Sequence, residues 1–371
     1  MLVSPRAPVI LAGLGVSLPP RIVSNDDLVA GGLDTSDEWI RSRTGIARRR
    51  WVTAGTSTSD LAVAAGRAAM RSAGSWDADL VLVATTTPDR RCPATAPEVA
   101  ARLGLGDVPA FDLGAVCSGF LYGLAVTAAL VSSGLYRRPL LIGAETYSTI
   151  IDPLDRDSAV IFGDGAGAVL LRRGGADEPG AITAVDLHSD GSGADLIAIE
   201  AGGSRLPDPA AVQERRLRYF RMRGREVYGQ AVRRMTASSN SVLEQAGWAS
   251  GEVEAFVGHQ ANQRILDAVA DRLGIGAGRR FGNIADVGNT AAASIPLAMA
   301  DAASRVRPGA RTLLTAFGGG LTWGSVALTW PDAVPLHSEP ADRAADERGT
   351  HDPDVSASGG TAHPEVRRAP G

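Results

Sequence analysis

One cysteine of the chain lies in a setting that suits a nucleophile. Cys117 follows the short apolar run 110–116, and a long apolar stretch over residues 121–130 comes directly after it. This pattern predicts a tight turn from a strand into a buried helix. Backbone N–H groups at a helix N-terminus favour a thiolate and can also hold an oxyanion. A free cysteine is otherwise a small, inert core residue, and the local pattern alone does not separate the two interpretations.

A histidine and an asparagine complete a set for acyl transfer. His259 ends the apolar run 255–258 much as Cys117 ends its own run, and Asn289 precedes a stretch of small residues. A lone histidine is more often structural, and an asparagine before a helix is by default an N-cap. As a functional set, Cys117 would take an acyl group as a thioester. Neutral His259 and Asn289 would then donate hydrogen bonds to a second thioester carbonyl.

Composition excludes several other kinds of chemistry. The 371 residues include no lysine, which rules out Schiff-base and lysine-base mechanisms. The net charge of −4 comes entirely from residues 331–371, so no basic field for nucleic acid is expected. Two cysteines and five histidines without zinc spacing predict no metal site, and no cofactor is expected. No stretch is expected to span a membrane and no signal peptide is seen, so the chain is expected to be cytoplasmic with free thiols.

The elements that must position these residues alternate between strands and helices. Apolar strands at 80–84 and 140–143 alternate with alanine-rich helices such as 60–73, which favours an α/β layered fold. Two echoes also run along the chain. A Phe-Gly-x-Gly turn before an apolar strand occurs at Phe162 and again at Phe317, and the run that ends at Cys117 resembles the run that ends at His259. Chance similarity of glycine-rich turns is the alternative.

These echoes predict two similar halves, with functional residues meeting at strand ends between them. We expect an N-terminal half over residues 1–180 that carries Cys117. A C-terminal half over residues 181–330 would carry His259 and Asn289. The segment 331–371, rich in Pro, Ala, Ser, Gly and charge, is expected to be a disordered tail.

Six motifs, in order, resemble the 3-oxoacyl-(acyl-carrier-protein) synthase III family of the thiolase superfamily. The resemblance covers residues 9–330 and implies a thiolase-like α-β-α-β-α fold and a homodimer. The motifs are Thr35-Ser36-Asp37-Glu38-Trp39-Ile40 with Arg43-Thr44-Gly45-Ile46, the Cys117 segment, Phe162-Gly163-Asp164-Gly165-Ala166-Gly167-Ala168, His259-Gln260-Ala261-Asn262, Gly288-Asn289-Thr290, and Phe317-Gly318-Gly319-Gly320-Leu321-Thr322-Trp323-Gly324-Ser325.

The resemblance implies a decarboxylative Claisen condensation that starts fatty acid or polyketide synthesis. An acyl-CoA primer acylates Cys117, and malonyl-acyl carrier protein then enters. His259 and Asn289 promote its decarboxylation by holding the thioester enolate. The backbone N–H groups of Cys117 and Gly319 form the oxyanion hole, and Phe317 lines the malonyl pocket.

The family pattern also implies contacts with coenzyme A and with the acyl carrier protein. The coenzyme A contacts fall on Trp39, Arg43, Arg156, Met222, Gly224, Tyr228 and Asn262. The carrier-protein contacts fall on Gln260, Ala261, Asn262, Gln263 and Arg264, of which Arg264 is the strongest candidate. A basic run between residues 215 and 225 could meet phosphates or the acidic carrier protein, or could be a solvated arginine face.

One departure from the family concerns the acyl group. Many acetyl-preferring relatives close the acyl pocket with a phenylalanine contributed across the dimer, and Cys92 stands at that position here. Removing the ring would leave room for a longer or branched primer. The sequence therefore predicts a primer larger than acetyl.

Two other functions remain open at this point. An acyltransferase could keep the acyl-Cys117 step and deliver the acyl group to an alcohol or amine without condensation. A non-enzymatic acyl-CoA-binding scaffold is the second alternative, and the intact set of Cys117, His259 and Asn289 argues against it.

Overall fold

The chain builds two β-sheets with helices between and outside them, in a computed structural model that describes residues 8–208, 210 and 213–340. The first sheet has the strand order β14-β1-β7-β6-β4-β5 and the second has the order β11-β12-β13-β8. The first-sheet strands are β1 (Val9–Ser17), β4 (Leu80–Ala84), β5 (Ala110–Leu113), β6 (Pro139–Thr146), β7 (Asp164–Arg173) and β14 (Leu336–His337). The second-sheet strands are β8 (Ile182–Ser189), β11 (Ala255–Gly258), β12 (Arg311–Gly318) and β13 (Thr322–Thr329).

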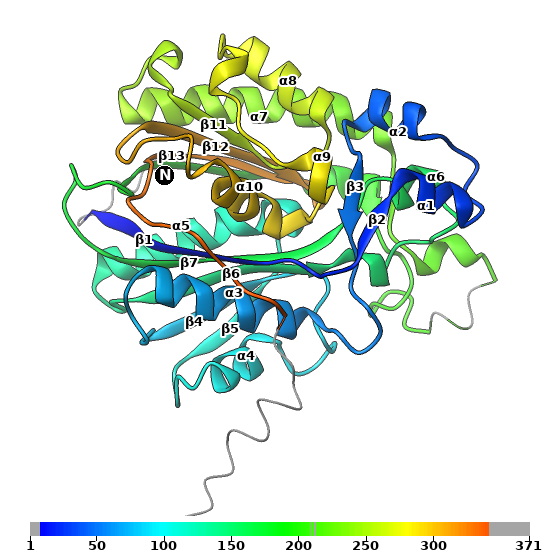
Figure 1. The fold of residues 1–371 in the computed structure, drawn as a ribbon, viewed down its shortest axis with the longest axis horizontal. Coiled ribbons are helices and arrows are strands. Elements are labelled where there is room, and N and C mark those ends of the chain that lie inside the picture. Colours follow the sequence, from blue (N-terminus) through cyan, green and yellow to red (C-terminus); the bar gives the residue numbers. More distant parts are fainter. Residues whose placement is uncertain (1–7, 209, 211–212, 341–371) are drawn as a thin grey trace, which may run out of the picture.

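The helices form three layers around these sheets, which confirms the predicted α-β-α-β-α arrangement (Figure 1). The outer layer on the first sheet contains α3 (Thr58–Ser72) and α4 (Ala96–Arg102). The outer layer on the second sheet contains α7 (Gly224–Ala246) and α8 (Gln263–Arg272). The middle layer, between the two sheets, contains α5 (Gly119–Ser133) and α10 (Ser294–Ala302).

The remaining elements are short and flank these layers. They are β2 (Ile22–Ser24), α1 (Asn25–Ala30), α2 (Asp37–Thr44), β3 (Arg48–Arg50), α6 (Arg156–Ala159), β9 (Ile197–Ala198), β10 (Arg221–Met222) and α9 (Ile284–Val287). Short 3₁₀ helices are η1 (Val116–Ser118), η2 (Tyr147–Thr149), η3 (Gly191–Leu196), η4 (Arg215–Arg218), η5 (Ser250–Glu252), η6 (Ala277–Arg279) and η7 (Ala291–Ala293).

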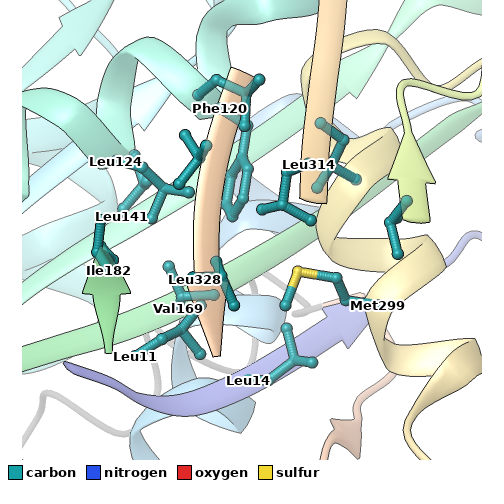
Figure 2. Close-up of a cluster of buried hydrophobic side chains, with 14 of the residues drawn as sticks. Leu11, Leu14, Phe120, Leu124, Leu141, Val169, Ile182, Met299, Leu314 and Leu328 are labelled. Carbon is teal, nitrogen blue, oxygen red and sulfur yellow. The ribbon is translucent and has the colours of Figure 1, made fainter. Parts of the chain in front are cut away.

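The middle layer is the apolar centre of the molecule. Side chains of the two sheets and of α5 and α10 interlock there, and Figure 2 shows Phe120, Leu124 and Met299 packed between Val169 of one sheet and Leu314 of the other. Each fully buried side chain of this size stabilises the fold by about 1.5–3 kcal/mol relative to exposure. The two sheets are therefore held together mainly by α5 and α10.

The two halves share one connectivity, which corrects one of the two predicted echoes. In the first sheet the antiparallel pair β6–β7 lies between β4, next to β6, and β1, next to β7. In the second sheet the antiparallel pair β12–β13 lies in the same way between β11, next to β12, and β8, next to β13. The strand before His259, β11, therefore corresponds to β4 and not to β5, which precedes Cys117. The counterpart of β5 is the isolated bridge between Phe256 and Arg280, and the turn that follows it carries Asn289. Cys117 is thus equivalent to the region of Asn289, while the Phe162 and Phe317 turns do occupy equivalent places before β7 and β13.

Helix α5 also differs from the sequence-based expectation about membranes. The segment Val116–Ser133 is long and apolar enough to cross a membrane, with a mean hydropathy of 1.6 over 18 residues. The expectation that no stretch approaches this length and hydropathy is therefore wrong. In the structure, 56% of this segment is buried inside the protein between the two sheets, as is usual for the core helix of a layered fold.

Part of the segment predicted to be a disordered tail is placed in the fold. Strand β14 pairs in parallel with β1, through Gly15 with Leu336 and Val16 with His337. The Ser338 backbone N–H also donates to the Val16 carbonyl. The rest of the predicted tail, residues 341–371, lies outside the described residues.

Close packing of β1 against α3 leaves no room for a side chain at Gly15. A Cβ atom at Gly15 would lie 2.1 Å from the Ala69 backbone nitrogen and 2.4 Å from the Ala65 carbonyl oxygen. We expect Gly15→Ala to lower the free energy of unfolding by about 3 kcal/mol, because backbone atoms of a buried helix cannot move aside cheaply. Denaturant unfolding would measure the loss. Gly175→Ala, in an exposed loop with no atom within 4 Å, is the control; equal stability of the two variants would refute the prediction.

Candidate active site

Cys117 lies on a strained turn at the start of α5. Strand β5 ends at Leu113, η1 follows, and Val116 has φ 47°, a left-handed conformation that is rare for a β-branched residue. Such strain costs about 1–3 kcal/mol and persists only where the surroundings impose it. The Ser118 hydroxyl does so in part, because it bonds to the Ala115 carbonyl at 2.8 Å and to Thr322 Oγ1 at 2.7 Å.

The second bond ties the cysteine turn to the glycine-rich turn after β12. Thr322 Oγ1 donates to the Gly319 carbonyl at 2.9 Å. A Cβ atom on Gly318 would lie 2.9 Å from the Cys117 backbone nitrogen, so glycine is needed for this approach. A Cβ atom on Gly319 would lie 3.4 Å from Val116 Cγ2, which places this glycine beside the cysteine turn. Phe317, one residue before Gly318, is buried and stacks on Trp323 with ring centroids 6.4 Å apart.

Burial keeps the Cys117 thiol neutral in the resting protein. The side chain is 8% exposed, and burial raises its pKa far above the usual value, with a further increase from the charge of Glu145. A backbone hydrogen bond acts in the opposite direction but is the smaller effect. Desolvation of the charge thus opposes the thiolate that the N–H groups of the helix N-terminus favour.

Glu145, a residue that the sequence analysis did not select, is the buried carboxylate near Cys117. It lies on β6 with no exposed surface and accepts hydrogen bonds from Thr86 N at 3.0 Å and Thr87 Oγ1 at 2.7 Å. Burial raises its pKa to about 7, and the hydrogen bonds from Thr87 and Thr86 lower it. Glu145 therefore changes charge near neutral pH. An acidic residue inside an apolar strand was the only available signal in the sequence.

His259 stands at the end of β11 and is almost completely buried. Its backbone N–H donates to the Thr315 carbonyl at 2.8 Å, and Nδ1 lies 2.6 Å from the Ser294 hydroxyl at the start of α10. Burial lowers its pKa to about 3, so the imidazole is neutral at physiological pH. With Nδ1 engaged by Ser294, Nε2 is the nitrogen available to a ligand.

Asn289 is fixed through its backbone and one side of its amide. Its N–H donates to the Ile161 carbonyl, and its own carbonyl accepts from Gly163 N, both at 2.9 Å. Oδ1 accepts from Ala291 N at 2.9 Å. This is a local bond to the residue two positions ahead, while the N-cap of η7 is Thr290, so the N-cap interpretation of Asn289 is wrong. The side-chain NH₂ group makes no hydrogen bond within the described residues and remains a donor for a ligand.

The structure brings the Cys117 and Asn289 turns together, with His259 attached to the second. Turn η1 packs against η7 and against the end of β12. A Cβ atom on Gly119 would lie 3.6 Å from the Ala292 Cβ. Ala291 has φ 45°, nearly the value of its counterpart Val116, so the two halves meet through equivalent strained turns. This arrangement gathers a thiol, a neutral imidazole and a free amide donor in one buried place.

The residues expected to contact coenzyme A lie on neighbouring surface elements. The Arg156 guanidinium of α6 lies over the Trp39 ring of α2, 4.7 Å from its centroid. Asn262 Nδ2 donates to the Arg43 carbonyl at 3.0 Å, which joins α2 to the His259 loop. Further along, Met222 lies on β10, Gly224 begins α7, and Tyr228 follows one turn later with 36% exposure.

The expected carrier-protein residues behave differently from one another, and one is corrected. Gln260 has no exposed surface; its Oε1 accepts from Asn283 N at 3.1 Å and its Nε2 donates to the Gly258 carbonyl at 2.7 Å. A side chain that is fully buried and hydrogen-bonded within the chain cannot contact another protein, so the prediction that Gln260 binds the carrier protein is wrong. Arg264 is exposed and lies 5.9 Å from the Tyr228 ring centroid. Ala261, Asn262 and Gln263 are partly exposed beside it.

The basic run near residues 215–225 is largely paired with acidic side chains. Arg215 bonds to Asp152 at 3.0 Å, and Arg216 and Arg221 contact Glu214 and Glu200. These pairs favour the solvated arginine face over a dedicated phosphate site. Cys92 lies in the loop that follows β4 and is exposed on the single chain. Its relation to the acyl pocket therefore depends on what covers it.

Comparisons with known proteins agree with this site. Sequence models of 3-oxoacyl-(acyl-carrier-protein) synthase III match residues 111–191, and those of its C-terminal part match residues 243–330. The chain is 56% identical to beta-ketoacyl-(acyl-carrier-protein) synthase III 5 of Streptomyces coelicolor over 335 residues, which cover 88% of this chain and 98% of the relative.

Two solved structures are similar over nearly their whole length. The 3-oxoacyl-(acyl carrier protein) synthase III of Pseudomonas aeruginosa has a TM-score of 0.82 and 49% identity, covering 88% of this chain and 100% of the other. The priming beta-ketosynthase of the R1128 polyketide pathway has a TM-score of 0.81 and 34% identity, covering 90% and 99%.

The reactivity of Cys117 should depend on Glu145 in a pH-dependent way. Replacing Glu145 by glutamine removes a negative charge that is present only above about pH 7, the pKa of this carboxyl. We expect Glu145→Gln to alkylate several-fold faster than the parent at pH 8.5 and at about the same rate at pH 6. Iodoacetamide labelling of the Cys117 peptide, measured by mass spectrometry in a Cys92→Ser background, would report the rates.

The control for this comparison is Glu244→Gln, which removes an exposed charge on α7. It should leave the rate unchanged at both pH values. A Glu145→Gln rate below that of the parent at pH 8.5 would show that Glu145 does not suppress the thiolate.

Proposed function

The chain belongs to the 3-oxoacyl-(acyl-carrier-protein) synthase III family, so its reaction is the condensation of an acyl primer with malonyl-acyl carrier protein, and we propose that Cys117, His259 and Asn289 carry it out. The observation that supports these roles best is the contact between the equivalent turns η1 and η7. This contact supports a nucleophile and an amide donor that act on the same substrate. The product, a 3-oxoacyl-acyl carrier protein, starts fatty acid or polyketide synthesis.

In the first step, Cys117 takes the acyl group from acyl-CoA. The sulfur attacks the thioester carbonyl, the C–S bond to coenzyme A breaks, and the thiol proton of Cys117 passes to the departing sulfur of coenzyme A. The backbone N–H groups of Cys117 and Gly319 stabilise the tetrahedral oxyanion. A neutral resting thiol fits this step, because the proton that it releases is the one that the leaving group requires.

In the second step, His259 and Asn289 stabilise the enolate of the malonyl thioester. Nδ1 of His259 lies 2.6 Å from the Ser294 hydroxyl. In this mechanism the hydroxyl is the donor, so Nε2 carries the proton and donates to the thioester oxygen beside the Asn289 amide. Carbon dioxide leaves, and the carbanion attacks the acyl-Cys117 carbonyl. Collapse of this second oxyanion expels the thiolate, which regains a proton from solvent. Phe317 lines the malonyl pocket and disfavours the charged carboxylate there.

Substrates would reach Cys117 past α2, α6 and α7. The stacked pair of Trp39 and Arg156 suits an adenine ring, since each presents a flat face. Met222, Gly224 and Tyr228 would follow the pantetheine arm. Arg264, exposed beside the His259 loop, would meet the acidic carrier protein. We expect the protein to work in the cytoplasm, where it would meet both of these substrates.

We further propose a homodimer through the edge of the first sheet. Strand β5 is the last strand of that sheet, and Phe111 on it is 40% exposed. An unpaired edge with an exposed aromatic side chain is suited to pairing with a second strand. The exposed Cys92 would then contribute to the acyl pocket of the partner copy. Two halves, residues 1–180 and 181–330, would be repeated in each copy.

The other functions considered from the sequence are not favoured. Transfer of the acyl group to an alcohol or amine needs no enolate stabilisation, yet His259 and Asn289 keep free donors. A non-catalytic scaffold needs no nucleophile. The identity of 56% to a condensing enzyme along nearly its whole length agrees with condensation.

Removing the enolate donors should separate the two half-reactions. We expect His259→Ala and Asn289→Ala to acylate Cys117 from acyl-CoA at near-parental rates, while release of CO₂ from malonyl-acyl carrier protein falls by about 10²–10³-fold. Intact mass and CO₂ trapping measure the two steps. His188→Ala, an exposed histidine paired with Asp186, is the control. A His259→Ala or Asn289→Ala variant that loses both steps equally would contradict this division of roles. Cys117→Ala should lose covalent acylation altogether.

The acyl pocket should favour primers larger than acetyl. Each buried methylene adds about 0.8 kcal/mol, so a four-carbon to eight-carbon acyl-CoA should acylate Cys117 with at least tenfold higher kcat/KM than acetyl-CoA. Cys92→Phe should reduce this preference, and Cys92→Ser, which keeps the side chain small, should preserve it. A higher kcat/KM for acetyl-CoA in the parent enzyme would show that the pocket is already closed.

A further inference from the structure

Two buried hydroxyl groups near Cys117 lack hydrogen-bond partners. Tyr147 has no exposed surface, and neither its Oη nor Thr86 Oγ1 has a partner that meets hydrogen-bond geometry within the described residues. The Thr86 hydroxyl nevertheless lies near both the phenol and the Glu145 carboxyl, because it lowers the pKa of each. An unpaired buried hydroxyl costs about 1–3 kcal/mol, so two at one place call for a ligand.

The topology of the first sheet brings both hydroxyls to the nucleophile. Strands β5, β4 and β6 are parallel neighbours, and their carboxyl ends lie along one edge of the sheet. Cys117 follows β5, Thr86 follows β4, and Tyr147 follows β6. Tyr147 and Cys117 belong to one cluster of packed side chains, and a charge on the Cys117 sulfur would raise the pKa of the phenol. The loop that begins with Thr86 continues to Cys92, the residue proposed for the acyl pocket.

Neither hydroxyl can easily move to find another partner. The Tyr147 ring stacks on Phe162 with centroids 4.6 Å apart and meets Phe220 edge-on at 5.4 Å. The backbone of Thr86 is held by the Glu145 carboxylate, which accepts its N–H at 3.0 Å. The aromatic rings pack against the phenol, while the Glu145 carboxylate lies beside Thr86. A rigid, buried polar pair discriminates strongly between ligands that can and cannot bond to it.

We propose that Tyr147 and Thr86 select an acyl primer that carries a hydrogen-bonding oxygen, a hydroxyl or a carbonyl, on its acyl chain. This inference rests on the proposed function, because it assumes that the acyl group enters through Cys117. Tyr147 donates to the oxygen of the primer, and Thr86 donates to it or accepts from it. The purely aliphatic primer of the same shape leaves both hydroxyls unpaired and is disfavoured.

The phenol keeps its proton throughout the working range. Burial raises the pKa of Tyr147 well above its ordinary value, and a negative charge on Cys117 or Glu145 raises it further. Tyr147 therefore remains a neutral donor at neutral and mildly alkaline pH.

Matched pairs of acyl-CoAs test the proposal on the purified full chain. One pair is 3-hydroxybutyryl-CoA and 3-methylbutyryl-CoA, and the other is 4-oxopentanoyl-CoA and 4-methylpentanoyl-CoA, so that an oxygen replaces a methyl group at constant shape. The readout is kcat/KM for acylation of Cys117, followed by intact mass without carrier protein. In at least one pair we expect the oxygen-bearing primer to exceed its partner by about tenfold.

Variants then assign the preference to the two hydroxyls. Tyr147→Phe and Thr86→Val keep the shape of the side chains, and each should reduce the ratio by at least about fivefold, by slowing the oxygen-bearing primer and sparing or speeding the aliphatic one. Tyr122→Phe is the matched control, because its hydroxyl donates to the His188 carbonyl on another element. That variant should retain the parental ratio.

The outcomes distinguish this proposal from the proposed function. If no acyl-CoA acylates Cys117, the proposed function itself fails. If acylation proceeds but the aliphatic primer is preferred in both pairs, or if the ratio survives in folded Tyr147→Phe and Thr86→Val, the selectivity proposal is wrong and the condensation remains. An equal slowing of all primers in Tyr147→Phe would also overturn it, since the phenol would then act on the reaction rather than on the choice of primer.

Discussion

The close approach of two helix N-termini across the middle layer is the constraint on which the site depends. The 3₁₀ turns η1 and η7 open α5 and α10, and they pack against one another at the centre of the molecule. Small residues make this possible: a Cβ atom on Gly143 would lie 2.4 Å from the Ala292 carbonyl oxygen. Both turns contain a non-glycine residue with positive φ, Val116 and Ala291. The apolar layer around them supplies the packing energy that holds this strain.

Burial decides the charge state of the groups that these turns present. It raises the pKa of Cys117 and lowers that of His259 to about 3, so both are neutral in the resting protein. The site therefore offers fixed donors rather than charges, and these donors act only when an oxyanion or enolate develops. Glu145 adds a carboxylate whose own pKa of about 7 lies in the physiological range. It opposes ionisation of the cysteine and also fixes the backbone of Thr86.

Much of the site could be predicted because its main groups lie in short, contiguous motifs. Cys117, His259 and Asn289 each follow an apolar run and precede small or helical residues, a local pattern that is visible in one dimension. Glu145 and Tyr147 have no such pattern, since they belong to a strand and a turn of mostly apolar character. Their meaning depends on the neighbours that the sheet brings to them. Gln260 shows the opposite error: it lies inside a functional motif, yet its amide is consumed by Asn283 and Gly258.

The sequence by itself determined the family and the layered fold and selected three candidate reactive groups, because periodicity and contiguous motifs record the strands, helices and turns along the chain. Only the tertiary structure decided which turns are equivalent, which side chains are buried and which protonation states follow. The equivalence of the Cys117 and Asn289 turns appears only in the order of strands in the two sheets. Burial and pKa arise from contacts between residues far apart in the chain, such as Thr86 and Tyr147, and a linear pattern does not carry them.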